Sequence, residues 1–217
     1  MAEGKCNSFI GYTYLHLFAA GILSAVSAKL NLVQKIGFNT EHILTIVFLG
    51  ILSLILVVCI VLLPIGIPKY ILFGVFVILL GATLRSVANR YNAEGTLTDV
   101  LLTVSGIFLM MTAVGFYDQQ NLLSYEVYLF AALVGLVLGR AGVGVAMIVD
   151  TDEKITGWNL FFSVLATFIF SLYLAYDTQM LKEMVRECKG KPDYINGALS
   201  LYLDIVNLFY NVDDLIK

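Results

Sequence analysis

Seven long apolar runs, joined by short polar linkers, constrain what this chain can fold into. They cover residues 8–29, 42–64, 70–88, 98–117, 122–148, 158–181 and 196–213. A helix needs about 20 apolar residues to cross the roughly 30 Å hydrocarbon core of a bilayer, so each run is long enough to span. The sequence therefore predicts an all-α polytopic membrane protein, a bundle of seven transmembrane helices that forms one integral-membrane domain over residues 1–217.

The composition argues against other classes of protein. Hydrophobic residues make up 59% of the 217 residues and charged residues only 13%, about half the charged share of a soluble domain. The apolar runs also lack the alternating pattern of a membrane β-barrel, and unbroken apolar backbone satisfies its hydrogen bonds in lipid as a helix. The net charge is −3 with no basic face, so we expect no nucleic-acid partner. The expected partner is the lipid bilayer, with other membrane or assembly proteins left open.

The cysteines and histidines follow no disulfide or metal pattern. Cys6, Cys59 and Cys188 are odd in number and lack metal-like spacing, so we interpret them as free thiols. His16 and His42 are isolated from other ligand residues. We expect His16 to pack among aromatic side chains of its own segment.

The orientation of the bundle rests on one linker. The Lys and Arg residues divide equally between the two sides of a seven-helix arrangement, so their overall count does not orient the chain. Four of them lie close together in the linker 182–191, which favours a cytosolic location for that linker and for the N-terminus. The N-terminal residues lack a charged leader, so we expect the first segment to be retained.

Small residues recur every three or four positions in three of the segments. Ala131, Gly135 and Gly139 form a small-xxx-small pattern, which lets helix backbones approach closely in lipid. Similar stripes are Ser163, Thr167 and Ser171 in the sixth segment, and Ala20, Ser24 and Ser27 in the first. We interpret all three stripes as helix-packing faces.

Two acidic residues lie within apolar segments, where an ionisable side chain costs several kcal/mol unless it is paired or hydrated. Asp177 is near the end of the sixth segment, and Asp204 is in the first half of the seventh. The short linker between the segments should bring the two carboxyls to a similar depth. The seventh segment also carries a polar stripe, which we define as Ser200, Asp204, Asn207, Asn211 and Asp214. A helix with such a stripe is expected at the bundle centre.

The two carboxyls suggest a pH-sensitive gate. If they meet in a poorly hydrated place, they cannot both ionise easily and would share a proton. The protonated pair could latch the two helices together, whereas the ionised pair would repel, open a wet path and offer hard oxygen ligands to Ca²⁺. Asp177 and Asp204 are therefore the candidate gate, pH sensor and Ca²⁺ ligands. The alternative is that each aspartate is only a hydrogen-bond partner for helix packing.

Two arginines also lie within the apolar segments. Arg85 is near the end of the third segment and could extend its side chain to the interface, or it could act as a counter-ion for an aspartate. Arg140 is about two-thirds along the fifth segment, so it needs either a partner such as Asp150 or a shorter membrane crossing.

The last two segments resemble the Bax inhibitor-1 (transmembrane Bax inhibitor motif) family, in its lifeguard, Golgi anti-apoptotic and bacterial branches. The match lies in FSLYLAYDTQ at 170–179, DYI at 193–195 and ALSLYLDIVNLF at 198–209. Weaker similarity extends over 12–28 and 97–116. The resemblance implies seven helices with the last one central, a cytosolic N-terminus, Ca²⁺ leak across an intracellular (ER- or Golgi-like) or bacterial membrane, and protection from cell death.

The family's di-aspartyl pH sensor falls on Asp177 and Asp204. Ca²⁺ is then the permeant ion, and no other cofactor is implied. Members with an understood gate also carry an acidic and a basic residue on the second helix, and the segment 42–64 has neither. Lys69 or Arg85 could supply the counter-charge.

The sequence is compatible with other functions. The chain could be a structural membrane anchor or assembly protein that keeps the fold without conducting, and a viral membrane is one setting because large DNA viruses carry copies of this family. Paired aspartates on adjacent helices also occur in intramembrane aspartyl proteases, but Tyr202 and Leu203 stand where glycines would precede the second aspartate. A serine protease and a signalling receptor lack their motifs here. We therefore expect a non-enzymatic protein.

Overall fold

The computed structural model describes residues 8–30, 43–117, 121–149, 153–187 and 193–216. Within these ranges every regular element is helical. The elements are α2 (Phe9–Leu30), α4 (Ile43–Leu62), α5 (Ile67–Glu94), α6 (Leu97–Tyr117), the 3₁₀ turn η1 (Leu122–Tyr125), α7 (Glu126–Val149), α8 (Glu153–Glu187) and α9 (Tyr194–Ile216). The predicted all-α class and the seven predicted helices are confirmed.

The helix ends differ from the apolar runs mainly where polar turns extend a helix. The run 158–181 lies inside α8, which continues at both ends to reach 35 residues, and the run 70–88 lies inside the 28 residues of α5. Helical hydrogen bonding continues through such polar turns in water, so hydropathy alone underestimates helix length. The run 122–148 begins with η1, whose Leu122 to Tyr125 precede the α-helical part.

Within the described residues, five stretches are helical and are long and apolar enough to cross a membrane. These stretches are Phe9–Leu30, Ile67–Glu94, Leu97–Tyr117, Leu122–Gly144 and Gly157–Arg186. The apolar part described in α4 is shorter, Phe48–Leu62. Helix α9 falls outside this group, and its polar stripe lowers its hydropathy. Even so, α9 has buried residues on each turn from Ile195 to Val212, which is typical of a helix that contacts protein on several sides.

The chain forms two compact units. Unit 1 comprises Met1–Glu94 and Met184–Tyr202, and unit 2 comprises Gly95–Glu183 and Leu203–Lys217. Helix α9 therefore contributes its first part to unit 1 and its remainder to unit 2.

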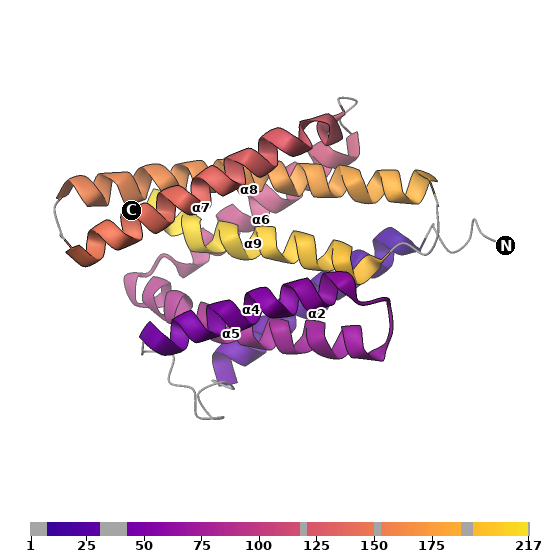
Figure 1. Ribbon diagram of the computed structural model, residues 1–217, viewed down its shortest axis with the longest axis horizontal. Coiled ribbons are helices and arrows are strands. Elements are labelled where there is room, and N and C mark those ends of the chain that lie inside the picture. Colours follow the sequence, from indigo (N-terminus) through magenta and orange to yellow (C-terminus); the bar gives the residue numbers. More distant parts are fainter. Residues whose placement is uncertain (1–7, 31–42, 118–120, 150–152, 188–192, 217) are drawn as a thin grey trace. The chain divides into compact units, whose positions relative to one another are not determined.

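In unit 1, α5 packs against both α2 and α4 (Figure 1). The contact with α2 uses the predicted small-residue stripe, because Ala20, Ser24 and Ser27 are all buried. Ser27 Oγ donates a hydrogen bond of 2.7 Å to the carbonyl oxygen of Ile78, and Ser24 Oγ lies 2.5 Å from Tyr202 Oη. Small side chains thus let the backbones of these helices come close.

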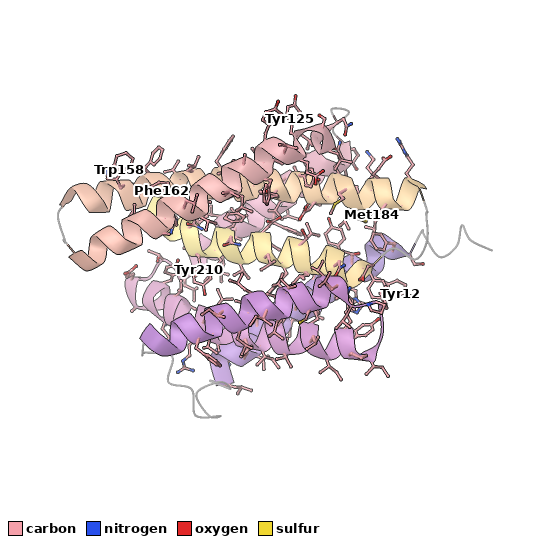
Figure 2. All side chains as sticks on the ribbon, viewed as in Figure 1. Tyr12, Tyr125, Trp158, Phe162, Met184 and Tyr210 are labelled. Atoms are coloured by element: carbon pink, nitrogen blue, oxygen red, sulfur yellow. The ribbon has the colours of Figure 1, made fainter. Side chains whose placement is uncertain are left out.

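In unit 2, α7 crosses α8 in the view of Figure 1 and contacts it at Gly139. A Cβ atom added to Gly139 would lie 2.2 Å from Cε1 of Phe162, so this glycine faces the ring directly. Ala131 and Gly135, the other two members of the predicted pattern, are exposed. Figure 2 labels Phe162 and Trp158, which lie near the start of α8 with their ring centroids 6.4 Å apart.

The outward faces of the described helices carry many large apolar side chains. On α4, for example, Leu54, Ile55, Val58 and Leu62 are all more than half exposed. Cys59 is a free, exposed cysteine on the same helix; Cys6 and Cys188 lie outside the described residues. Soluble proteins rarely expose so much apolar surface to water, so these faces are suited to contact with lipid.

Candidate functional site

Asp177 on α8 and Asp204 on α9 meet within unit 2. Both are buried, with 4% and 6% of their surface exposed, and their carboxyl groups share a hydrogen bond. A hydrogen bond between two carboxyls requires that one of them carries the proton. Among the described residues, Oδ2 of Asp204 has no hydrogen-bond partner. The pair is therefore a buried acid dyad with an acceptor oxygen still available.

The end of α6 positions the part of α8 that carries Asp177. Gly115 of α6 faces the α8 backbone, since a Cβ there would lie 2.5 Å from the carbonyl oxygen of Ala175. On the next turn, Gln179 Oε1 accepts a 2.7 Å hydrogen bond from the backbone N–H of Leu122, and Lys182 donates to the carbonyl oxygen of Phe116. Asp177 thus lies close to the level at which α6 ends and η1 begins.

The polar stripe of α9 continues beyond Asp204 toward the C-terminus. Asn207 and Asn211 donate hydrogen bonds of 2.8 and 2.6 Å to the carbonyl oxygens of Leu203 and Asn207, one turn earlier in the same helix. Asn211 is buried and Ser200, at the other end of the stripe, is partly buried. The side chain of Asp214 lies outside the described residues. The NH2 groups of both side chains therefore donate within α9. The amide oxygen of Asn211 accepts a hydrogen bond from Arg140 of α7.

Other ionisable groups surround the carboxyl pair. Tyr173 and Tyr176 belong to α8, and Tyr173 interacts electrostatically with both aspartates. Glu126, exposed at the first residue of α7, interacts with both tyrosines. The dyad therefore has acidic and phenolic neighbours.

The start of α9 is held by an ion pair that sequence reasoning missed. Lys69 of α5 is completely buried and forms a salt bridge with Asp193, and its ammonium also donates to the carbonyl oxygen of Leu63 at 2.9 Å. Oδ1 of Asp193 in turn accepts hydrogen bonds of 3.1 Å from the backbone N–H groups of Ile195 and Asn196. Asp193 is thus the N-cap of α9 as well as the partner of Lys69.

An aromatic cluster lies beside this ion pair in unit 1. The hydroxyl groups of Tyr70 and Tyr194 share a hydrogen bond, and the ring of His16 lies 5.7 and 5.1 Å from these two rings. Tyr12, labelled in Figure 2, lies 5.6 Å from Tyr194. The ring of His16 thus contacts aromatic rings of α5 and α9, and its Nδ1 atom lies 2.7 Å from the carbonyl oxygen of Tyr12 on its own helix. His42 lies outside the described residues.

The two intramembrane arginines bind different partners. Arg85 Nη1 donates a hydrogen bond of 3.1 Å to the carbonyl oxygen of Ala28, near the C-terminal end of α2. Arg140 Nη2 donates to Ser163 Oγ of α8 at 2.6 Å and to Asn211 Oδ1 of α9. The sequence suggested Asp150 as a partner for Arg140, but that residue lies outside the described part. Nothing in the apolar pattern of α7 could have singled out Ser163 or Asn211.

The arrangement can hold a proton between two carboxyls and, once ionised, offer oxygen ligands to a hard cation. In the described part of the chain, no group of three or more His, Cys, Asp or Glu side chains could hold a metal ion.

The apolar helices and the buried acid dyad define a polytopic α-helical membrane protein. Proteins of similar sequence include membrane proteins. Inner membrane protein YbhL of Escherichia coli K12 is 33% identical over 144 residues, which is 64% of this chain and 58% of that protein. An uncharacterized protein of Deinococcus radiodurans is 30% identical over 142 residues, again 64% and 58%. An uncharacterized membrane protein of Streptococcus pyogenes, SpyM3_0260, is 28% identical over 144 residues. The matched segment spans a little over half the length of these relatives.

The family Bax1-I, described as inhibitor of apoptosis-promoting Bax1, matches residues 6–216. This chain belongs to the Bax inhibitor-1 family. The resemblance found in the sequence is therefore confirmed.

Proposed function

We propose that this protein is a pH-sensitive Ca²⁺ leak channel of the Bax inhibitor-1 family, gated by Asp177 and Asp204, which modulates cell death where its host has such a pathway. The single observation that carries the proposal is the buried hydrogen bond between these two carboxyls. In the protonated state this bond holds α8 to α9. When the pair ionises, two like charges repel in a poorly solvated place, and the helices separate around a hydrated path.

The depth of the pair supports exchange of protons with one aqueous compartment. Trp158, exposed near the start of α8, is the type of residue that gathers at a bilayer interface. Asp177 follows 19 residues later, which at 1.5 Å per residue is about 28 Å along the helix, close to the thickness of the hydrocarbon core. The pair then lies near the interface opposite Trp158, on the side of the linker 182–195.

The location that goes with this function is an intracellular membrane of the ER or Golgi type, or one derived from it, with the N-terminus in the cytosol. The four basic residues of the linker 182–191 support this orientation. Residues 1–7 and the linker residues 188–191 lie outside the described part of the chain.

Calcium flux into proteoliposomes, measured from pH 5 to 8, tests the proposal. The parent protein should conduct more Ca²⁺ as the pH rises, because deprotonation breaks the latch and creates oxygen ligands. Asp177→Asn and Asp204→Asn should each lose this pH dependence, because an amide can keep the hydrogen bond but cannot ionise. Asp99→Asn is the matched control: it removes an exposed carboxylate from the first turn of α6 and should keep the parental profile.

A membrane anchor that does not conduct is the competing function. The absence of charged residues from the segment 42–64 favours it, because a cation path usually includes fixed charges along its wall. Flux no higher than in empty liposomes, from folded protein, would reject the channel and leave the dyad as a helix-packing contact.

A further inference from the structure

Arg140 places a charged side chain within an apolar helix, which costs free energy in lipid, and it is not part of the proposed gate of Asp177 and Asp204. A guanidinium within an apolar helix needs hydrogen-bonding partners and is by default a candidate for function. Here one nitrogen, Nη2, binds Ser163 of α8 and Asn211 of α9 together. Both acceptors are buried, with 0% and 5% of their surface exposed. A side chain from α7 thus joins the two helices that carry the acid dyad.

The contact lies on the face of α9 that bears Asp204. Asn211 follows Asp204 by seven residues, which is close to two full turns, so the two side chains project from the same face about 10 Å apart. Rotation of α9 that turned Asn211 away from Arg140 would also turn Asp204 away from Asp177. The side-chain NH2 group of Asn211 donates within α9, to the carbonyl oxygen of Asn207. This fixes the amide so that its oxygen faces the guanidinium.

We propose that Arg140 is a positioning residue for the acid dyad: through Asn211 it holds α9 in the rotation that keeps Asp204 turned toward Asp177. The inference deepens the proposed function and rests on it, since it concerns the same gate. It differs from a simple packing role because it couples a guanidinium on α7 to the sharing of a proton between two carboxyls two turns away.

The test is an infrared titration of the protonated carboxyl groups in the full-length protein, which does not require conduction. Glu126, which interacts electrostatically with Tyr173 and Tyr176, also carries a carboxyl group, so all variants carry Glu126→Gln to remove its signal. Asp177→Asn and Asp204→Asn assign the signals. In the parent, the dyad should lose its protons in two steps more than about one pH unit apart, as interacting sites do.

Arg140→Gln should merge the two steps into one, since α9 can then rotate and separate the carboxyls. Asn211→Leu should do the same while it keeps the arginine. Arg85→Gln is the matched control, because it removes an intramembrane arginine that binds Ala28 and should keep both steps. Two parental steps in folded Arg140→Gln or Asn211→Leu would overturn the inference.

Arg140→Lys keeps the positive charge and covers the case in which Arg140→Gln does not fold. An ammonium lacks the planar fork of a guanidinium, so it should hold the two acceptors less well and bring the two steps closer together. A parental separation in the lysine variant would also overturn the inference. If the parent protein shows the two titration steps but conducts no Ca²⁺, the channel function is rejected. If the parent conducts Ca²⁺ but the Arg140 variants keep both titration steps unchanged, the positioning role of Arg140 is rejected.

Discussion

Gly81 allows α5 to approach α2 more closely than any residue with a side chain would. A Cβ atom at this position would lie 2.6 Å from the carbonyl oxygen and 2.7 Å from the Cα atom of Ser24. The neighbour is backbone, which cannot rotate away as a flexible side chain can. The helices themselves would have to separate, and with them the hydrogen bond from Ser27 to Ile78.

We expect Gly81→Ala to destabilise the protein by about 1–3 kcal/mol, the usual cost of overpacking a tight contact. Gly74→Ala is the matched control on the same helix, because a Cβ there meets nothing within 4 Å. It should be neutral or raise stability by up to about 1 kcal/mol through better helix propensity. Thermal unfolding of the purified protein measures both. Equal unfolding temperatures for the two variants would contradict the close approach.

At the scale of elements, the N-terminus of α9 depends on α4 and α5. Lys69 binds both the carbonyl oxygen of Leu63, just after α4, and the carboxylate that caps α9. Asn196 adds a weaker hydrogen bond of 3.4 Å to the carbonyl oxygen of Val61. Three helix ends are thus joined around one buried ammonium.

Lys69→Met should lower the free energy of unfolding by about 2–4 kcal/mol, because it leaves Asp193 without its cation. The double variant Lys69→Met with Asp193→Asn should recover part of the loss, since asparagine caps a helix about as well as aspartate and carries no charge. Denaturant or thermal unfolding of the single and double variants gives the coupling. Strictly additive losses would mean that the ion pair contributes nothing.

The helices could be predicted from the sequence because lipid demands long apolar runs, and the run 8–29 differs from α2 by one residue at each end. The two aspartates were also visible, since a charge in an apolar segment stands out. The partners of Lys69, Arg85 and Arg140 were not, because each contact joins residues far apart in the chain or uses a backbone carbonyl. Apolar periodicity carries no information on which polar groups meet.

At the scale of the whole molecule, the exposed surface of the described helices is suited to lipid. The Cys59 thiol can report on this surface, because it lies on α4 among exposed apolar side chains. Its environment in a bilayer distinguishes a lipid-facing helix from one that borders an aqueous path.

In liposomes, and in a background with Cys6→Ser and Cys188→Ser, we expect Cys59 to resist a charged maleimide and to react with an apolar one. Lys182→Cys, on the exposed end of α8, is the control and should react with both reagents. Mass spectrometry of the labelled protein reports the extent of each reaction. Fast labelling of Cys59 by the charged reagent would place water along α4.

The ion pair between Lys69 and Asp193 also has a consequence for biogenesis. The two residues are 124 positions apart in the sequence. During synthesis Lys69 therefore has no ion-pair partner until α9 has been made. That helix carries Asp204, Asn207 and Asn211, and polar residues of this kind oppose independent entry into lipid. Its insertion should therefore depend on earlier helices already in place. A nascent chain that stops before residue 193 should keep an uncompensated charge and be degraded faster than the finished protein.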